Sequence, residues 1–302
     1  MNMRLWAILG LIFLCLNSLS ANENFVCTVC QKHVSRGFTV KGSFYCPDHV
    51  ESALPRCYNC DQPISGRYHE VSERKLSICS TCREKIPQCF LCSLPADPQR
   101  GGEALRDGRH VCADDSKLAV KTAQQARRLF QQAEGEVRDT FGSALRLKDP
   151  IARIELVDLK GFERAAAGSG HINGVKAGKV LGVTTVVFVS RGEEKWLEPA
   201  VIHLLDHVSS RRMLSVSAHE YAHVWQAQHH RDYAQTKPIL REGFAEWVAY
   251  KVAQRHGRQD QMTVMMNPNG GDYYLGLRKF LELERQRGVE GVLTYAKKAT
   301  KI

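Results

Sequence analysis

The chain has 302 residues, of which 43% are hydrophobic and 25% are charged. These values are ordinary for a globular protein and exclude general disorder and a multi-span membrane protein. The formal net charge of +10 favours anionic partners or surfaces. The sequence has no run of five basic residues and no basic-aromatic RNA signature, so we do not expect nucleic acid as a partner.

The N-terminus has the features of a secretory signal peptide. Arg4 precedes an apolar stretch from Leu5 to Leu16, and small residues follow at Ser20 and Ala21. The apolar stretch is shorter than the roughly 20 residues that a spanning helix needs, although an uncleaved N-terminal anchor is the alternative. We therefore expect residues 1–21 to be a signal peptide, the protein to be periplasmic or secreted, and no stable membrane span after cleavage.

All 11 cysteines lie before residue 113, and from residue 27 they form a repeated pattern of pairs. Each pair has a gap of two residues, which lets two side chains of one tight turn face the same tetrahedral ion. The chain between the two pairs of a set is long enough for a short hairpin. The pattern predicts three structural zinc sites, with ligands Cys27, Cys30, Cys46 and His49, then Cys57, Cys60, Cys79 and Cys82, then Cys89, Cys92, Cys112 and Asp115.

Two alternatives accompany this prediction. Export to an oxidising compartment would favour disulfides, but the constant gap and the replacement of cysteine by His49 and Asp115 favour zinc. In the third set, Asp114, His110 or a water molecule could replace Asp115. The segment has little apolar content, so metal binding is expected to drive its folding, and a partner protein could dock on it.

The pattern after Asp115 predicts helix, then strands, then helix again. Apolar residues at helical spacing predict a helix from Ser116 to Phe141, which would link the two modules. Three segments rich in β-branched residues predict strands, with a Gly-rich loop at 168–178: Ile151 to Val157, Val180 to Val189, and Ala200 to Leu205.

The segment from Met213 to Gln228 has helical periodicity and contains the motif His219-Glu220-Tyr221-Ala222-His223. Residues four apart lie on one face of a helix, so both imidazoles can bind one zinc ion. Glu220 is rotated about 100° from His219 and can reach a water molecule on that ion. The nearby His229 and His230 are adjacent and cannot face the same way, so we expect both to be exposed.

A second segment could complete this site. Eighteen residues separate His223 from Glu242, which begins the pattern Glu242-Gly243-Phe244-Ala245. This resembles the gluzincin arrangement, in which a second helix carries the third zinc ligand as Glu within Glu-Gly-x-Ala. By the same resemblance, Glu246 would accept the other N–H of a ligand imidazole, whereas the plain alternative is an acid on a solvated helix face.

Two His and one Glu leave a fourth position of the zinc ion for water. The sequence therefore predicts catalytic zinc held by His219, His223 and Glu242, with Glu220 as general base in peptide-bond hydrolysis. A second donor to the developing oxyanion would be one of Tyr250, Tyr273, Tyr274 and His256, among which the sequence does not choose.

The combination of cysteine pairs, His-Glu-x-x-His and a downstream Glu-Gly resembles the plant organ-size regulators of the DA-one family. The matching stretches are Tyr45 to His49, Pro55 to Cys60, Arg74 to Leu76 leading into Cys79 and Cys82, His219 to His223, and Glu242-Gly243. The resemblance implies a LIM-like zinc segment, a peptidase and a protein or peptide substrate. The chain departs from that family in lacking an acidic ubiquitin-interacting segment and in having the signal-like N-terminus.

Together these observations predict an α+β protein. A zinc-ribbon or LIM-like module (22–117) would precede a helical linker (118–149) and a mainly helical, zincin-type peptidase domain with a small β-sheet (150–302). About four zinc ions are expected, one catalytic and three structural. The competing hypothesis is a non-catalytic adaptor that uses its zinc fingers to bind a partner protein.

Overall fold

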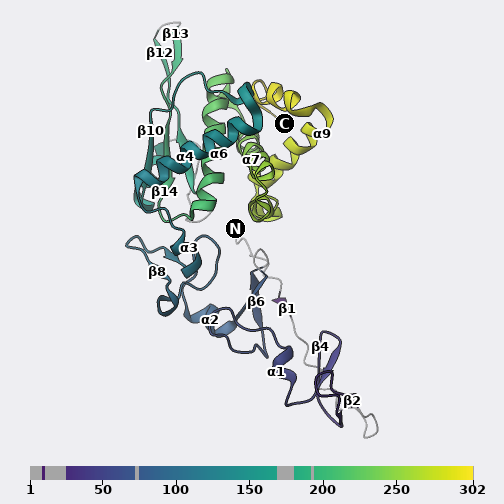
Figure 1. Cartoon of the computed structure of the whole chain (residues 1–302). Helices are drawn as coiled ribbons and strands as arrows, with labels where there is room; N and C mark the ends of the chain where they lie inside the picture. The colour runs from purple at the N-terminus through teal and green to yellow at the C-terminus, as the bar shows by residue number, and fades with distance from the viewer. Residues whose placement is uncertain (1–8, 11–24, 72–74, 169–179, 192–193, 302) are drawn as a thin grey trace. The chain divides into compact units, whose positions relative to one another are not determined.

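The computed structural model describes residues 9–10, 25–71, 75–168, 180–191 and 194–301 (Figure 1). The protein is a mixed α/β structure that divides into two compact units. Unit 1 consists of Met1–Ala104 and His110–Ala113, and unit 2 of Leu105–Arg109 and Asp114–Ile302. The predicted signal peptide lies outside the described residues apart from β1 (Leu9–Gly10), which pairs with β6.

Unit 1 repeats one backbone turn at the first Cys-x-x-Cys pair of each of its three ligand sets. In each turn the N–H of the first cysteine donates to the carbonyl five residues later, and the residue four positions on donates back to that cysteine. The residue after the second cysteine, which is Gln31, Asp61 or Ser93, has a positive φ of about 60° in all three. This shared turn brings the two sulfurs of a pair close together.

Each turn is followed by a short antiparallel hairpin, as the spacing between the cysteine pairs predicts, and then by a short helix. The second ligand pair of each set lies where the hairpin gives way to the helix. The strands are β2 (Phe25–Val26), β3 (His33–Val34), β4 (Phe38–Val40), β5 (Ser43–Tyr45), β6 (Tyr68–Val71), β7 (Leu76–Cys79), β8 (Glu103–Ala104) and β9 (His110–Val111). The helices are α1 (Val50–Ala53), α2 (Ser80–Lys85) and α3 (Ala113–Lys117), which belongs to unit 2 from Asp114 onward, with a 3-10 turn η1 (Pro98–Arg100).

Unit 2 contains a three-stranded sheet in the order β10-β14-β11. The central strand β14 (Val201–Leu205) is parallel to β10 (Arg153–Val157) and antiparallel to β11 (Gly182–Thr185). A helix, α5 (Leu159–Gly168), packs against all three strands and buries Phe162 and Ala166. A separate hairpin is formed by β12 (Phe188–Arg191) and β13 (Glu194–Leu197).

Helix α6 (Ser210–His229) is buried on almost every side and packs against two other helices and strand β11 of unit 2. Aromatic rings lie at the centre of this core. The ring centroid of Trp225 on α6 is 5.3 Å from that of Phe244, which is 5.8 Å from that of Phe280. The other helices are α4 (Ala123–Phe141), α7 (Pro238–Arg255), α8 (Gln259–Met265) and α9 (Asp272–Ala296), with 3-10 turns η2 (Gly142–Leu145), η3 (Tyr233–Gln235) and η4 (Pro268–Gly270).

Two of the predicted elements are interrupted in the structure. The predicted helix from Ser116 to Phe141 is two helices. A new helix begins after Thr122, whose side chain caps it and forms a capping box with Gln125. The predicted strand from Val180 to Val189 is two strands in different sheets. Most of the predicted Gly-rich loop at 168–178 lies outside the described residues.

Helix α4, expected to be a linker, belongs to unit 2. It buries Ala126, Phe130, Ala133 and Val137 and packs against α6. Its apolar residues at helical spacing are therefore the contact face of a core helix. Among the described residues, no helix has both the length and the apolar character that crossing a membrane requires.

A buried cation joins three segments of unit 2. The Arg109 side chain is only 2% exposed and forms ion pairs with Asp107, at 2.7 Å, and with Asp206. It also donates to the Asp206 carbonyl at 2.9 Å, while Asp107 accepts the N–H of Leu159 at 3.2 Å. Burial would raise the pKa of Asp107, but hydrogen bonds from Arg109 lower it to about 2, so the carboxylate stays ionised.

We expect Arg109→Met to destabilise unit 2 by about 3 kcal/mol, because it leaves two carboxylates without their buried partner. The measurement is urea unfolding of the metal-loaded protein, followed by circular dichroism. Arg285→Met is the matched control, since Arg285 and Glu282 form an ion pair with exposed side chains, and it should leave the unfolding midpoint unchanged. Equal midpoints for the two variants would contradict the structural role of Arg109.

Candidate metal centres

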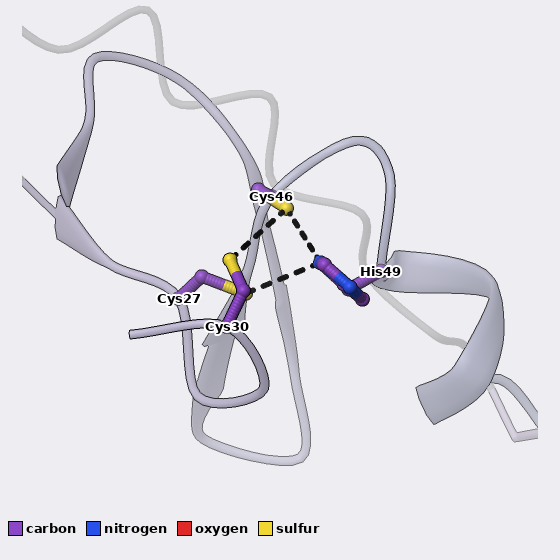
Figure 2. A group of neighbouring side chains, drawn as sticks. All are labelled: Cys27, Cys30, Cys46 and His49. Atoms are coloured by element: carbon purple, nitrogen blue, oxygen red, sulfur yellow. Dashed lines mark hydrogen bonds between the residues drawn. The ribbon is translucent and has the colours of Figure 1, made fainter. Parts of the chain in front are cut away.

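The structure assembles each predicted cysteine set into a group that could bind zinc or another metal ion. The ligand atoms of each set all lie within 4.8 Å of one another: Cys27, Cys30, Cys46 and His49; Cys57, Cys60, Cys79 and Cys82; Cys89, Cys92, Cys112 and Asp115. Figure 2 shows the first set, with the Cys46 sulfur and the His49 ring turned toward the sulfurs of Cys27 and Cys30.

The sulfur separations fit a tetrahedral ion and not a disulfide. One pair in each set is separated by 4.0, 3.9 or 3.6 Å between sulfurs. A disulfide requires about 2.05 Å. Zinc–sulfur bonds of about 2.3 Å at tetrahedral angles place two sulfurs about 3.8 Å apart. None of the ten described cysteines forms a disulfide in the structure.

Backbone N–H groups lower the thiol pKa of the first cysteine in the first two sets. N–H groups of Cys30 and Cys46 lower the pKa of the Cys27 thiol to about 6. Burial would raise the pKa of Cys57, but N–H groups of Cys60, Cys79 and other residues lower it to about 7. The thiolate is the form that binds metal, so these turns favour the ligand state before an ion arrives.

Asp115 is the fourth member of the third set. It is 5% exposed and lies in α3, three residues after Cys112. Of the open alternatives, Asp114 and His110 are absent from the group whose ligand atoms lie together. A carboxylate oxygen is a chemically suitable ligand beside three thiolates.

A fourth group lies in the core of unit 2, where α6 and α7 pack against each other. His219 and His223 are one helical turn apart on α6, and Glu242 lies on α7. His219 Nε2 is 3.1 Å from His223 Nε2 and 3.2 Å from Glu242 Oε2, and His223 Nε2 is 3.4 Å from the same oxygen. The three atoms form a nearly equilateral triangle.

This triangle fits one tetrahedral ion. Metal–ligand bonds of about 2.0 to 2.1 Å at tetrahedral angles place neighbouring ligand atoms about 3.3 to 3.4 Å apart. The observed separations of 3.1 to 3.4 Å match that edge length. Two imidazoles and one carboxylate are a ligand set that zinc accepts. The two histidines are buried and Glu242 is mostly buried.

The other ring nitrogens of the two histidines are also engaged. His219 Nδ1 is 3.0 Å from Glu246 Oε2, and His223 Nδ1 is 3.4 Å from the Tyr233 hydroxyl. Because each Nε2 faces the triangle, we assign the proton to Nδ1, which donates to the carboxylate or the hydroxyl. Glu246 is therefore not on a solvated face. Tyr233, which the sequence analysis missed, fixes the second ring.

Carboxylates make this group attractive to positive charge. Burial would lower the pKa of His219, but hydrogen bonds with Glu242 and Glu246 raise it to about 10. Burial would also raise the pKa of Glu242, yet His223 and His219 hold it well below its usual range. A cluster with this excess of acidic groups gains most from a divalent cation.

A close approach of α7 and α9 explains why the residue after Glu242 is glycine, Gly243. A Cβ on Gly243 would lie 2.5 Å from the Cα of Gly276 on α9, and a Cβ on Gly276 would lie equally close to the Cα of Gly243. The two helices therefore touch backbone to backbone. This contact brings Tyr273, one turn before Gly276, over the His219 ring, with centroids 5.6 Å apart.

A pocket opens at the three ligand atoms. Its lining includes Glu220, which is 4% exposed, and Tyr273, but none of the other proposed oxyanion donors, which were Tyr250, Tyr274 and His256. Further lining residues were not predicted from the sequence, namely Gly182, Val183, Thr184, Tyr233 and Arg241. They lie on β11, η3 and α7, and none of them belongs to a motif that the sequence singled out.

The expectation that His229 and His230 are exposed is wrong for His230. Its side chain is 2% exposed, with Nε2 3.1 Å from the Ala299 carbonyl and Nδ1 accepting the N–H of Asp232 at 3.0 Å. His229 is partly buried and stacks on Trp225 at 4.6 Å. Both have structural partners and neither belongs to the metal group.

No protein-family model, curated protein or solved structure matches this chain. The resemblance to the DA-one family therefore depends on the quoted motifs alone, and the function has to be argued from the site.

We expect the purified protein to carry about four equivalents of zinc, because each of the four groups can complete a tetrahedral site. Inductively coupled plasma mass spectrometry of protein prepared without added zinc would measure this. Cys60→Ser should lower the content by about one equivalent, since it removes one ligand of the second set. About one equivalent in the unchanged protein, with five disulfides in the intact mass, would rule out the three cysteine sites.

Proposed function

We propose that this protein is a zinc-dependent peptidase that hydrolyses peptide bonds of protein substrates. The observation that carries the proposal is the position of Glu220. This carboxylate lines the same pocket as His219, His223 and Glu242 without being part of their ligand triangle. A structural metal site needs ligands alone, whereas hydrolysis also needs a base beside them.

Zinc in this site would act as a Lewis acid, activating a water molecule and polarising the carbonyl of the scissile bond. Glu220 would take the proton from the attacking water and pass it to the leaving amine. Glu246 and Tyr233 would keep the imidazoles of His219 and His223 oriented during turnover.

Tyr273 is our choice for the donor to the oxyanion. It lines the pocket, and its ring stacks on His219. Burial, together with the carboxylates of Glu242, Glu220 and Glu246, raises the pKa of Tyr273 well above its usual value. Its hydroxyl therefore keeps its proton and can donate a hydrogen bond to charge that develops on the substrate oxygen.

Unit 1 would serve the peptidase as a structural zinc module that also offers a surface for a partner protein. Each cysteine set supplies four ligand groups, which leaves no open position for a substrate. Export to the periplasm or the exterior remains part of the proposal and depends on the N-terminal sequence pattern.

Three carboxylate variants should fail in different ways. Glu220→Gln should keep four zinc ions but lose about 100-fold to 10,000-fold in turnover, because only the proton transfer is removed. Glu242→Ala should lose one zinc ion together with activity. Glu246→Ala should lose about 10-fold to 100-fold in metal affinity or activity. Zinc content and casein cleavage measured on the same samples would test this.

The outcome also separates the peptidase from a non-catalytic adaptor. Metal-dependent cleavage that disappears in Glu220→Gln supports the enzyme. A zinc-loaded wild-type protein that cleaves neither casein nor peptide libraries would support the adaptor. If Glu246→Ala loses the metal while Glu242→Ala keeps it, our assignment of the third ligand is wrong.

Tyr273→Phe should lower kcat, with KM and zinc content unchanged, because the ring and its stacking on His219 remain while the donor is lost. Removal of one oxyanion donor typically costs about 100-fold to 1,000-fold in kcat. Tyr274→Phe is the control, since Tyr274 is next in the chain and does not line the pocket. Steady-state kinetics on a quenched fluorescent peptide would distinguish the two, and equal kcat values would exclude Tyr273.

A further inference from the structure

Strand β11 lies against the helix that carries Glu220. It is an outer strand of the sheet, and it packs on α6. Three of its residues, Gly182, Val183 and Thr184, line the pocket that contains the metal group. Side chains alternate along a strand, so Gly182 and Thr184 face the same side, and that side faces Glu220.

Thr184 makes a short contact with the carboxylate. Its hydroxyl, on a residue that is 7% exposed, donates to Glu220 Oε2 at 2.7 Å and lies 3.2 Å from the Glu220 carbonyl oxygen. A hydrogen bond to a charged acceptor in a buried place is stronger and more directional than one in water. The carboxylate is thereby tied to the strand through one of its two oxygens.

Gly182 makes room for the other oxygen. A Cβ at this position would lie 2.5 Å from Glu220 Oε1 and 2.7 Å from Val216 Cγ1, both closer than real Cβ contacts allow. The space left by Gly182 and the hydroxyl of Thr184 together hold the Glu220 carboxylate against β11. Any larger residue at 182 would push Oε1 away from its place.

We propose that Thr184 is a positioning residue for Glu220, and that strand β11 is the element that aims the general base. The hydroxyl holds Oε2 and thus fixes the rotation of the carboxylate, so that Oε1 is left to accept the proton. A base that is misplaced by about 1 Å loses on the order of 100-fold in rate. This inference rests on the proposed peptidase function for its kinetic consequence, but not for its structural one.

The test compares two threonines that are neighbours in the same strand. Thr184→Val keeps the shape of the side chain and removes the hydroxyl that holds Glu220. Thr185→Val makes the same chemical change where the hydroxyl is buried with no partner among the described residues. Thr184→Ser restores a hydroxyl. All three would be made in the full-length, zinc-loaded protein, with zinc content and melting temperature measured alongside.

We expect Thr184→Val to lower kcat by about 10-fold to 100-fold, a loss typical of removing a supporting hydrogen bond in a metal site. KM and zinc content should not change, Thr184→Ser should recover most of the rate, and Thr185→Val should match the wild type. A purely structural role would instead lower the melting temperature without a selective fall in kcat. Equal kcat for Thr184→Val and Thr185→Val, or no recovery in Thr184→Ser, would overturn the proposal.

A crystal structure of Thr184→Val gives a reading that does not depend on activity. We expect the Glu220 carboxylate to turn away from β11 in Thr184→Val and to keep its place in Thr185→Val. If it stays in place in both, Thr184 does not position it. If it turns only in Thr184→Val while the wild type cleaves no peptide, the positioning stands and the peptidase assignment fails.

Discussion

The packing of α6 against α7 is the interaction on which the metal group of unit 2 depends. The three ligand atoms come from two helices, so their separations of 3.1 to 3.4 Å are set by how closely those helices approach. Phe244 controls that approach, because its ring contacts Trp225 on α6 and Phe280 on α9. Burial of such rings is worth more per residue than any single hydrogen bond of the site. The apolar core therefore holds the polar site in shape.

The two units obtain their order from different sources. Unit 2 has large, fully buried side chains such as Trp225, Trp247 and Phe130. The buried hydrophobic side chains of unit 1 other than cysteine, for example Val40, Ile64 and Ile78, are smaller and scattered along the chain. Structural metal sites can supply the folding free energy that such a core lacks. Loss of metal should consequently unfold unit 1, whereas in unit 2 it should change only the surroundings of the metal group.

Sequence patterns predicted the ligand groups because ligand spacing is local. Cys-x-x-Cys pairs and His219 with His223 each lie within one turn of backbone, so their geometry follows from the turn or helix itself. Helix α6 was also identified from its helical periodicity, and strands β10 and β14 were identified from their β-branched residues. Glu242 was found only through resemblance to a known motif, and its proximity to His219 is a tertiary contact.

Residues that depend on tertiary packing were not found. Thr184, Tyr233 and Arg241 reach the pocket from β11, η3 and α7. No motif lies beside Thr184 or Tyr233, and Arg241 lies just outside the motif that begins at Glu242. Among four proposed oxyanion donors, only the contact between α7 and α9 singles out Tyr273. The break before α4 was missed for a different reason, because Thr122 caps the helix within a segment whose apolar spacing continues across it.

The contact between Gly243 and Gly276 has an evolutionary consequence. No side chain separates the two helices there, so a larger residue at either position forces α7 and α9 apart. A shift of α7 would move Glu242, and a shift of α9 would move Tyr273. A new rotamer of a nearby side chain cannot reverse either movement. Related sequences should therefore keep small residues at both positions together, or lose Glu242 and Tyr273 together. This pair of glycine positions should covary more strongly than either position does with its neighbours in the chain.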